Sequence, residues 1–476
     1  MKETILDWDA TKLAHAIQAG VVTSLQATET YIDHLQRVNP ELNAMVEERF
    51  EQARIEAEEC DRLLKEGKAK GKWFGVPISV KESFHVKGMR TTGGLIHRRD
   101  WIEQSDAAVV QRLKSEGVIV LGKTNTPTLC FCQESVNKLY GRTNNPWDLT
   151  RTAGGSSGGE AALIAVGGAA VGIGSDIGGS IRFPAHFNGV IGFKSGKHQV
   201  SQEGHFPFVT EPLQQDMLGI GAMAKSVNDA ETMNGIITNT PAPHVDLNNF
   251  QLCFPPFHTF IPLGEDTQQL LLNVKSALGT SFSITEEFPF KPQTLALLWQ
   301  QVMSIDAGKG ISDAAFPEKG MSPIPLYLKE ILFEKTSYHR FLTWALIGAS
   351  LFRPRGKQVN KLVATLEDMN QWSEQKLAKQ ILLLPVYHRG ALPHGQLYGE
   401  LFSIQKTFLR YIPYVALANL LGLPSLTIPI GVDQSNMPIA LQLVSRVGNE
   451  KALFDLGRIL ESTFRGYIRC KKWDPA

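Results

Sequence analysis

Four serines lie in a part of the chain that is rich in glycine, and a lysine follows an apolar segment upstream of them. The serines are Ser156, Ser157, Ser175 and Ser180, and the lysine is Lys81. A serine hydroxyl becomes an effective nucleophile when a base takes its proton. A buried lysine can be that base, because burial lowers its pKa and favours the neutral amine. These residue types indicate hydrolysis through a serine nucleophile.

The segment 172–184 reads GIGSDIGGSIRFP and is the most informative one in the chain. Consecutive glycines permit backbone conformations closed to other residues and let a ligand approach the amides closely. Amides that point to one place can hold an oxyanion, and losing one such donor typically costs about 10²–10³ in rate. We therefore expect Ser180, which follows the glycines, to be the nucleophile.

Two other matches to known motifs lack the structural context that the motifs need. Residues 117–124, GVIVLGKT, fit the P-loop expression, but the apolar residues between the glycines should form a strand rather than a phosphate-binding loop. Residues 154–158, GGSSG, fit the nucleophile elbow, but a turn-forming segment rather than a strand precedes them. Neither match indicates a nucleotide-binding protein or an α/β-hydrolase.

Composition excludes several classes of protein. The 476 residues carry 48 Lys and Arg against 47 Asp and Glu, so no charge excess favours nucleic-acid binding. Five cysteines without a disulfide framework favour a reducing compartment, and the N-terminal residues do not resemble a secretion signal. We therefore expect a cytoplasmic protein. Cys130 and Cys132 have no second cysteine pair and no nearby histidine cluster, so no metal site is expected.

Strand and helix patterns alternate around these residues. Residues 76–80 and 118–121 are β-branched runs bounded by glycines, and residues 107–115 between them have helical spacing. Such alternation predicts an α/β layered sheet, in which Lys81 stands at a strand end.

The rest of the chain adds elements but no domain boundary. Residues 25–64 predict helix with an interruption at 39–40, and residues 425–463 predict two strands followed by a helix. Residues 240–390 are less informative. Because no repeat or linker divides the chain, we expect one domain over residues 1–476.

Six segments together resemble the amidase signature family. They cover the first half densely and the last sixty residues moderately, and they are GVPISVKE at 75–82, GVIVLGKTN at 117–125, GRTNNPWD at 141–148, GGSSGGE at 154–160, GSDIGGSIRFP at 174–184 and GLPSLTIPIG at 422–431. The sequence around Glu82, Glu160 and 176–182 is most similar to that of the fatty acid amide hydrolase branch.

The resemblance implies an α/β fold in which helices cover both faces of a central mixed β-sheet. Within the single domain it implies a helical segment at 1–70, a catalytic core at 71–235, a variable substrate-channel region at 236–390 and a return to the core at 391–476.

The resemblance also implies a Ser-Ser-Lys triad and an acyl-enzyme. Ser180 would attack an amide carbonyl, Ser156 would pass the proton to neutral Lys81, and the peptide bond between Gly155 and Ser156 would be cis. The remaining implied roles are the oxyanion-binding amides, given by Ile177, Gly178, Gly179 and Ser180, and the supporting side chains Ser157, Asp176 and Arg182.

By the same resemblance, Cys130 and Phe131 would line the acyl pocket. Residues 341–352, an apolar run flanked by arginines, would be a lid, a peripheral membrane contact or a core helix, and we favour the core helix. The expected reaction is hydrolysis of hydrophobic amides, fatty acyl or arylalkyl, without metal or cofactor. No nucleic-acid partner is expected, and members of this family are often homodimers.

Two alternatives stay open. One is the glutamine-hydrolysing subunit of a tRNA-dependent amidotransferase, against which stand Ile177, where those subunits usually carry Thr, and the apolar residues near Cys130. The other is a catalytically silent binding protein on the same scaffold.

Overall fold

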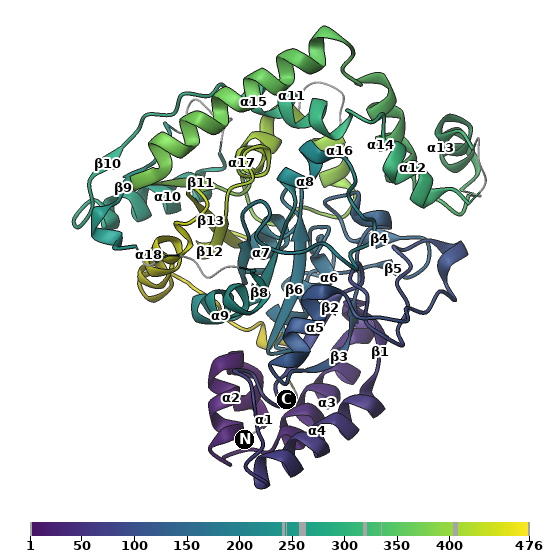
Figure 1. The fold of residues 1–476 in the computed structure, drawn as a ribbon, viewed down its shortest axis with the longest axis vertical. Helices are drawn as coiled ribbons and strands as arrows, with labels where there is room; N and C mark the ends of the chain where they lie inside the picture. Colours follow the sequence, from purple (N-terminus) through teal and green to yellow (C-terminus); the bar gives the residue numbers. More distant parts are fainter. Residues whose placement is uncertain are drawn as a thin grey trace.

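The computed structural model describes residues 2–239, 243, 245–256, 263–317, 321–334, 336–402 and 408–474. Within these residues the strands form one sheet of eleven and a separate hairpin of two. The large sheet runs through the centre of the molecule, as Figure 1 shows, and combines parallel and antiparallel pairs. This is a single α/β domain with a mixed sheet, as predicted.

The strands of the sheet are not in chain order, because the catalytic and C-terminal parts of the chain contribute neighbouring strands. From one edge to the other they are β1 (Met45–Glu48), β3 (Ile119–Thr124), β2 (Pro77–Lys81), β6 (Val171–Asp176), β8 (Gly219–Ala224), β7 (Ile191–Lys194), β12 (Ser425–Val432), β13 (Pro438–Val444), β11 (Gln380–Pro385), β9 (Gln251–Cys253) and β10 (Ile284–Thr285). The hairpin consists of β4 (Val136–Asn137) and β5 (Gly141–Arg142).

Helices cover both faces of the sheet. A Cβ at Gly457 of α18 (Glu450–Thr463) would contact Leu426 and Ile428 of β12, so α18 packs on the face of the sheet to which these two side chains point. Thr427 points to the other face, where its neighbour Gln442 accepts a hydrogen bond from Arg182 at the start of α7 (Arg182–Asn188). The alternation of side chains along a strand therefore places α7 and α18 on opposite sides.

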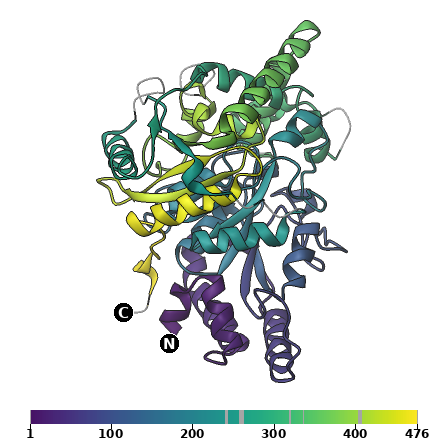
Figure 2. The same cartoon turned by 60° about the vertical axis from the view of Figure 1, so that its left-hand side comes forward.

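Some helices pack on the two faces of the sheet, and others, among them α13, α14 and α15, lie beyond the central strands in the upper part of Figure 1 (see also Figure 2). They are α1 (Lys2–Asp7), α2 (Ala10–Gln18), α3 (Ser24–Leu42), α4 (Phe50–Lys65), α5 (Ala108–Ser115), α6 (Gly158–Ala165), α7 (Arg182–Asn188), α8 (Pro212–Met217), α9 (Val227–Ile237), α10 (Glu265–Leu278), α11 (Pro292–Met303), α12 (Lys309–Ala315), α13 (Pro323–Phe333), α14 (Arg340–Leu351), α15 (Lys357–Lys376), α16 (Gln396–Phe402), α17 (Phe408–Leu420) and α18 (Glu450–Thr463).

The N-terminal helical segment differs from the prediction in one respect. Thr23 caps α3 with a capping box, but the helix continues beyond Pro40 to Leu42. The interruption comes at Asn43, whose left-handed conformation ends the helix, and edge strand β1 follows. The predicted break at 39–40 is therefore wrong by a few residues, because proline in the last turn did not end the helix.

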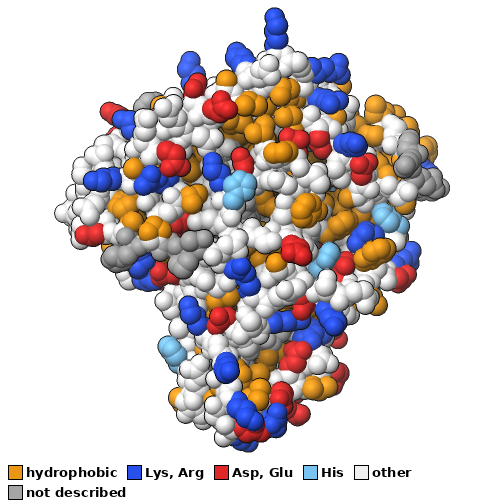
Figure 3. Space-filling view, in the orientation of Figure 1, with side chains coloured by type: hydrophobic (Ala, Val, Ile, Leu, Met, Phe, Trp, Pro, Cys, Tyr) orange, Lys and Arg blue, Asp and Glu red, His pale blue; other side chains and the backbone are white. Residues whose placement is uncertain are grey.

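The region at 240–390 is mainly helical in its described residues and lies beside the catalytic core. Helix α14 covers the predicted apolar run at 341–352 and buries one face, which includes Phe341, Leu342, Ala345 and Leu346. Exposed apolar side chains concentrate on α13, where Ile324, Leu328, Ile331, Leu332 and Phe333 are each at least half exposed, whereas in 341–352 only Leu351 is exposed to that degree. Apolar side chains gather over this upper part of the molecule in Figure 3. Among the described helices, none combines the length and apolar character needed to span a bilayer.

Candidate active site

Lys81 is the last residue of β2, which lies between the parallel strands β3 and β6. The residues Pro77–Lys81 are all buried, since both faces of this central strand are covered. Lys123, the lysine of the P-loop match, lies on β3. Its amine donates hydrogen bonds to Thr91 Oγ1, at 2.8 Å, and to Arg90 O. Residues 119–124 are thus a buried strand, which confirms the strand predicted at 118–121 and continues it to Thr124, where a polar turn was expected.

The Lys81 amine is surrounded by hydroxyl and carbonyl oxygens. Its Nζ lies 2.7 Å from Ser156 Oγ and 3.0 Å from Ser175 Oγ, and 3.5 Å from the carbonyl oxygen of Ser175. The Lys81 side chain is 0% exposed. Burial lowers the pKa of Lys81, while Cys130, Asp176 and Glu160 act in the opposite direction. The net effect favours a neutral amine beside a serine hydroxyl.

Ser156 and Ser157 lie on the loop that leads into α6. The peptide bond between Gly155 and Ser156 is cis, as the family resemblance implies. Ser157 contacts the loop that carries Ser180, which we call the nucleophile loop after the predicted role of that serine. The backbone N–H of Ser157 donates to Ser180 O at 3.1 Å, and its hydroxyl donates to Ser175 O at 3.5 Å. Both serines are buried against the end of β6.

A buried ion pair holds the loop that carries Ser180. Arg182 donates to both oxygens of Asp176, at 3.1 and 3.0 Å, and neither side chain is exposed. Burial alone would raise the pKa of Asp176, but the Arg182 charge and its hydrogen bonds hold that pKa far below its usual value. The carboxylate also accepts the backbone N–H of Ile181 at 3.0 Å. Asp176 and Arg182 therefore fix the ends of the loop.

The backbone amides of this loop are not equivalent. Gly179 N–H donates to Asp176 Oδ1 at 2.8 Å, so this amide already has an acceptor. Among the described residues, the amides of Ile177, Gly178 and Ser180 have no such acceptor. Gly179 has φ +91°, and a Cβ there would lie 2.6 Å from Phe183, so the loop conformation requires glycine at this position.

Helix α11 covers the same loop from the opposite side of the site. The indole nitrogen of Trp299 donates to Ile177 O at 3.0 Å, and a Cβ on Gly178 would lie 2.7 Å from the indole ring. The tryptophan thus packs directly on the glycines. Nothing in the local pattern of 240–390 marked Trp299 as part of the site.

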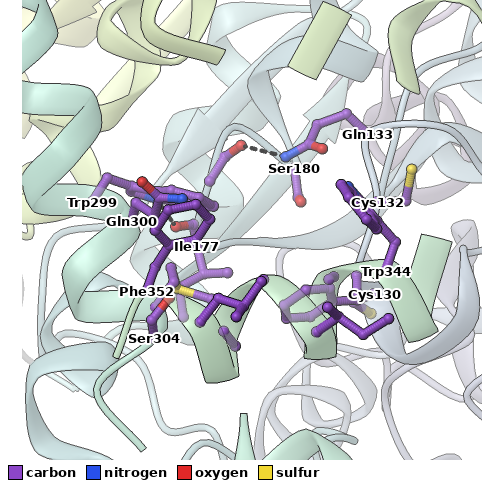
Figure 4. A pocket seen from close by; sticks show the side chains of 18 residues that line it. Cys130, Cys132, Gln133, Ile177, Ser180, Trp299, Gln300, Ser304, Trp344 and Phe352 are labelled. Atoms are coloured by element: carbon purple, nitrogen blue, oxygen red, sulfur yellow. Dashed lines mark hydrogen bonds between the residues drawn. The ribbon is translucent and has the colours of Figure 1, made fainter. Parts of the chain in front are cut away.

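Two cavities meet at Ser180. The larger one, of about 970 Å³ including space that is open to solvent, is mainly apolar, and Figure 4 shows Trp299 and Gln300 on one side and Cys130, Cys132 and Trp344 on the other. The second cavity is lined by Ser156, Ser175, Ser180 and His205, among others. Cys130 and Phe131 line both cavities. Residues 341–352, for which a core helix is favoured over a lid or a membrane contact, form a wall of the larger cavity through Trp344, Ile347, Gly348, Leu351 and Phe352.

Sequence reasoning did not assign His205 or Ser175 a position in the site. His205 Nε2 lies 3.0 Å from Ser175 Oγ, which in turn contacts Lys81. Ser175 had a signal, because it stands in the glycine-rich segment. The histidine had none, because it lies beyond the end of that segment at Pro184 and in none of the segments that resemble the family.

Comparisons with known proteins agree with this arrangement. A family model described as "Amidase" matches residues 26–254 and 351–454. Fatty-acid amide hydrolase 2-B of Danio rerio is 32% identical, over 98% of this chain and 91% of the relative. A glutamyl-tRNA(Gln) amidotransferase subunit of Thermosynechococcus vestitus is 28% identical, over 93% of this chain and 95% of the relative.

The fold is also that of solved structures. A 6-aminohexanoate cyclic dimer hydrolase in complex with its substrate superposes with a TM-score of 0.81 at 23% identity, covering 98% of this chain and 99% of that one. The family model covers well over half of the chain, and the matched residues include Lys81, both loop serines and Ser180. The chain therefore belongs to the amidase signature family and is an amide hydrolase.

Proposed function

We propose that this chain hydrolyses amides with apolar acyl groups through a Ser-Ser-Lys triad, in which Ser180 is the nucleophile, Ser156 the relay and Lys81 the base. The observation that carries the proposal is the buried Lys81 amine, which lies 2.7 Å from Ser156 Oγ. Ser156 in turn lines the same cavity as Ser180. A neutral amine in this position has its natural proton donor in the serine hydroxyl.

In the proposed reaction, Ser156 gives its proton to Lys81 and takes the proton of Ser180. The Ser180 oxygen then bonds to the amide carbonyl carbon, and the carbonyl oxygen becomes an oxyanion. When the C–N bond breaks, the proton held by Lys81 passes back through Ser156 to the leaving amine. Water, activated through the same relay, attacks the acyl-enzyme and releases the acid, which restores Ser180.

The oxyanion would be held by backbone amides of the nucleophile loop. The amides of Ile177, Gly178 and Ser180 support this role, because no described acceptor occupies them. The Gly179 amide, which donates to Asp176, would contribute by fixing the loop rather than by binding the oxyanion. Such preorganised donors lose little energy to reorganisation when charge develops.

The larger cavity supports an apolar acyl group. Its walls are predominantly apolar, with Trp299, Met303, Trp344 and Phe352 among them. A fatty acyl or arylalkyl chain would be desolvated there next to Ser180, with about 25 cal/mol gained for each Å² of apolar surface removed from water. The name of the Danio rerio relative, a fatty-acid amide hydrolase, agrees with this substrate class.

Active-site labelling tests the nucleophile. A fluorophosphonate should label the wild-type protein and not Ser180→Ala, while Ser156→Ala should be labelled slowly. Ser135→Ala is a matched control, since Ser135 is also a buried serine on a neighbouring loop and donates to Ser156 O at 3.5 Å. Equal labelling of the wild type and Ser180→Ala would reject Ser180 as the nucleophile.

A substrate panel tests the acyl group and separates the alternatives. Fatty acyl and arylalkyl amides should have a higher kcat/KM than acetamide. Release of ammonia from free glutamine at a comparable kcat/KM would instead favour the amidotransferase function that the 28% identical relative represents. No turnover of any amide, together with no labelling, would leave a binding protein on the same scaffold.

We also propose that the chain contacts a lipid surface through α13 rather than through 341–352. The exposed side chains Leu332 and Phe333 support this, since α13 has five apolar side chains that are at least half exposed and 341–352 has one, Leu351. Liposome co-sedimentation should be reduced in Leu332→Glu/Phe333→Glu. Val21→Glu/Ile55→Glu is the control, since both residues are equally exposed in the N-terminal helical region, far from α13 in Figure 1. Equal sedimentation of all three proteins would rule out this contact.

A further inference from the structure

We propose that His205 is a positioning residue, which acts through Ser175 to keep the lone pair of the Lys81 amine directed at Ser156. The inference rests on the proposed role of Lys81 as base. It adds a fourth and fifth residue to the site, joined to the triad by a directed chain of hydrogen bonds.

The histidine ring is held at both nitrogens. Nδ1 lies 3.0 Å from the carbonyl oxygen of Pro207, and Nε2 lies 3.0 Å from Ser175 Oγ. The residue is 6% exposed and lines the same cavity as Ser156 and Ser180. Its environment is therefore fixed by these two contacts rather than by bulk water.

The contacts determine which atoms donate. A carbonyl oxygen can only accept, so Nδ1 must carry the hydrogen that is directed at Pro207. Burial, with the Lys81 charge as a further cause, lowers the pKa of His205 to about 3, so the ring is neutral at physiological pH. A neutral ring with its hydrogen on Nδ1 has a lone pair on Nε2. Ser175 must then donate its hydroxyl hydrogen to His205.

This orientation decides what Ser175 offers to Lys81. With its hydrogen directed at His205, the hydroxyl presents only oxygen lone pairs to the amine, 3.0 Å away. A second acceptor, the carbonyl oxygen of Ser175, lies 3.5 Å from the amine. A neutral amine has two hydrogens, and these two oxygens receive them. The amine lone pair is left for Ser156 Oγ, at 2.7 Å the shortest of the three oxygen contacts. The Cys130 side chain also contacts the amine.

The backbone ties His205 to the chain that follows Lys81. His85 N–H donates to Gly204 O at 2.8 Å, and Phe206 N–H donates to Ser83 O at 2.7 Å. The imidazole also packs edge-on against Phe84, with ring centroids 5.0 Å apart. These contacts therefore fix His205 Nε2, the acceptor, relative to the Lys81 amine.

Other charged or titratable groups near this chain do not replace the histidine. Asp176, Glu160 and Cys130 face Lys81, and His85 faces His205. Within the described part of the chain, Ser175 Oγ has hydrogen-bond partners only in Lys81 and His205. Without the histidine, the Ser175 hydroxyl could turn its hydrogen toward the Lys81 lone pair and compete with Ser156.

Two substitutions at His205 test this role. His205→Leu removes the acceptor, and we expect kcat to fall about 10- to 100-fold with little change in KM, because misdirecting a catalytic group mainly affects the chemical step. His205→Gln can accept from Ser175 with its amide oxygen and donate to Pro207 with its NH₂ group. It should keep kcat within about threefold of the wild type.

The pH profile distinguishes positioning from a structural defect. In His205→Leu, a Ser175 hydrogen directed at the Lys81 lone pair favours the neutral amine. The acidic limb of the kcat profile should therefore move to lower pH while the plateau falls. His34→Leu is the control, because His34 is likewise fully buried and bonded to a backbone carbonyl, that of Val166. It should lower thermal stability without moving the limb.

Coupling between the two residues completes the test. If His205 acts through Ser175, adding His205→Leu to Ser175→Ala should lower kcat by less than twofold further. Independent, multiplicative losses would overturn the proposal, as would equal defects in His205→Leu and His205→Gln, or an unmoved pH limb.

A measurement on the unaltered protein keeps the proposal testable if His205→Leu does not fold. Nitrogen-15 NMR of the histidine side chains should show His205 as a neutral ring with its hydrogen on Nδ1 at pH 7. A hydrogen on Nε2 would overturn the proposal. Failure of the proposed function would appear differently, as normal activity in a Lys81 variant with the His205 tautomer unchanged.

Discussion

At the scale of single residues, the proposed site depends on Lys81, which the fold buries away from water. Lys81 and Lys123 are both buried lysines on adjacent strands, but their surroundings differ. Lys123 faces the carboxylates of Glu82, Glu47 and Glu103, and burial lowers its pKa to about 8. Lys81 is directed at serine hydroxyls instead. The partners of each amine, and not burial alone, separate a structural lysine from a candidate base.

The pH dependence of activity follows from the pKa of Lys81. In the proposed mechanism the neutral amine is the active form, and burial lowers the pKa of Lys81 from its ordinary 10.5. Activity should therefore be lost as pH falls through that lowered pKa and should reach a plateau on the alkaline side. Steady-state kcat measured across pH checks this. A profile that declines toward alkaline pH would contradict the proposed base.

Replacing the two lysines separates chemistry from packing. Lys81→Met should lower kcat by about 10²–10⁴, the range of general-base contributions, with the fold retained by circular dichroism. Lys123→Met is the matched control and should change stability but leave kcat of the folded protein within about threefold of the wild type. Equal losses of kcat in both variants would indicate that burial of a lysine, rather than its position, matters.

At the scale of elements, the loop between β6 and α7 is the most constrained part of the site. Gly179→Ala forces a side chain into a left-handed conformation and against Phe183. We expect a loss of about 1–3 kcal/mol in the free energy of unfolding, and a loss of labelling by fluorophosphonate. Gly235→Ala in α9 is the control: a Cβ there meets no atom within 4 Å, so alanine should stabilise the helix by up to about 1 kcal/mol. Urea unfolding measures both.

If the larger cavity holds the acyl group, as proposed, helix α14 should set the length that it accepts. Gly348 lines this cavity, and a Cβ at that position would contact no atom within 4 Å. The side chain of Gly348→Phe would therefore project into open space, and it should lower kcat/KM for long acyl chains at least about tenfold while sparing short ones. A uniform loss across chain lengths would show that α14 does not contact the acyl group.

At the scale of the whole molecule, one sheet brings distant parts of the chain to the same place. Lys81, Ser156, Ser175 and Ser180 come from β2, the loop before α6, and the end of β6 with the loop after it. Arg182, next to the nucleophile loop, also donates to Val415 O at 2.9 Å and to Gln442 at 2.9 Å, on elements more than 230 residues away. Helix α17 and strand β13 therefore support the loop that carries Ser180 directly.

The first and last described segments are joined by Arg469. Its guanidinium donates to Asp7 Oδ1 at 2.7 Å and to both oxygens of Asp474, at 2.6 and 2.8 Å, with the Arg469 side chain only 1% exposed. Arg469→Ala should lower the free energy of unfolding by about 2–3 kcal/mol, the range for hydrogen bonds to charged groups, without changing kcat. Arg62→Ala, which breaks exposed pairs with Glu59 and Glu66, should cost much less, because water screens these pairs. Equal costs would mean that burial does not distinguish the two arginines.

The sequence by itself determined the local chemistry and most of the local structure. The strand before Lys81, the helices at 108–115 and 450–463, and the glycine-rich loop before Ser180 were all predictable, because each follows from propensity, periodicity or backbone freedom over a few neighbouring residues. The segments that resemble the amidase signature family are likewise local, and they sufficed for the fold and for the amide-hydrolase activity.

Only the tertiary structure decided which groups meet across long separations. The contact of His205 with Ser175, the cover of Trp299 on the nucleophile loop, and the occupation of the Gly179 amide by Asp176 all depend on side-chain directions that no local pattern contains. The same holds for α14, whose composition favours a core helix but also fits a lid or a membrane contact. A helix becomes a cavity wall through the elements packed against it, and that packing exists only once the whole chain has folded.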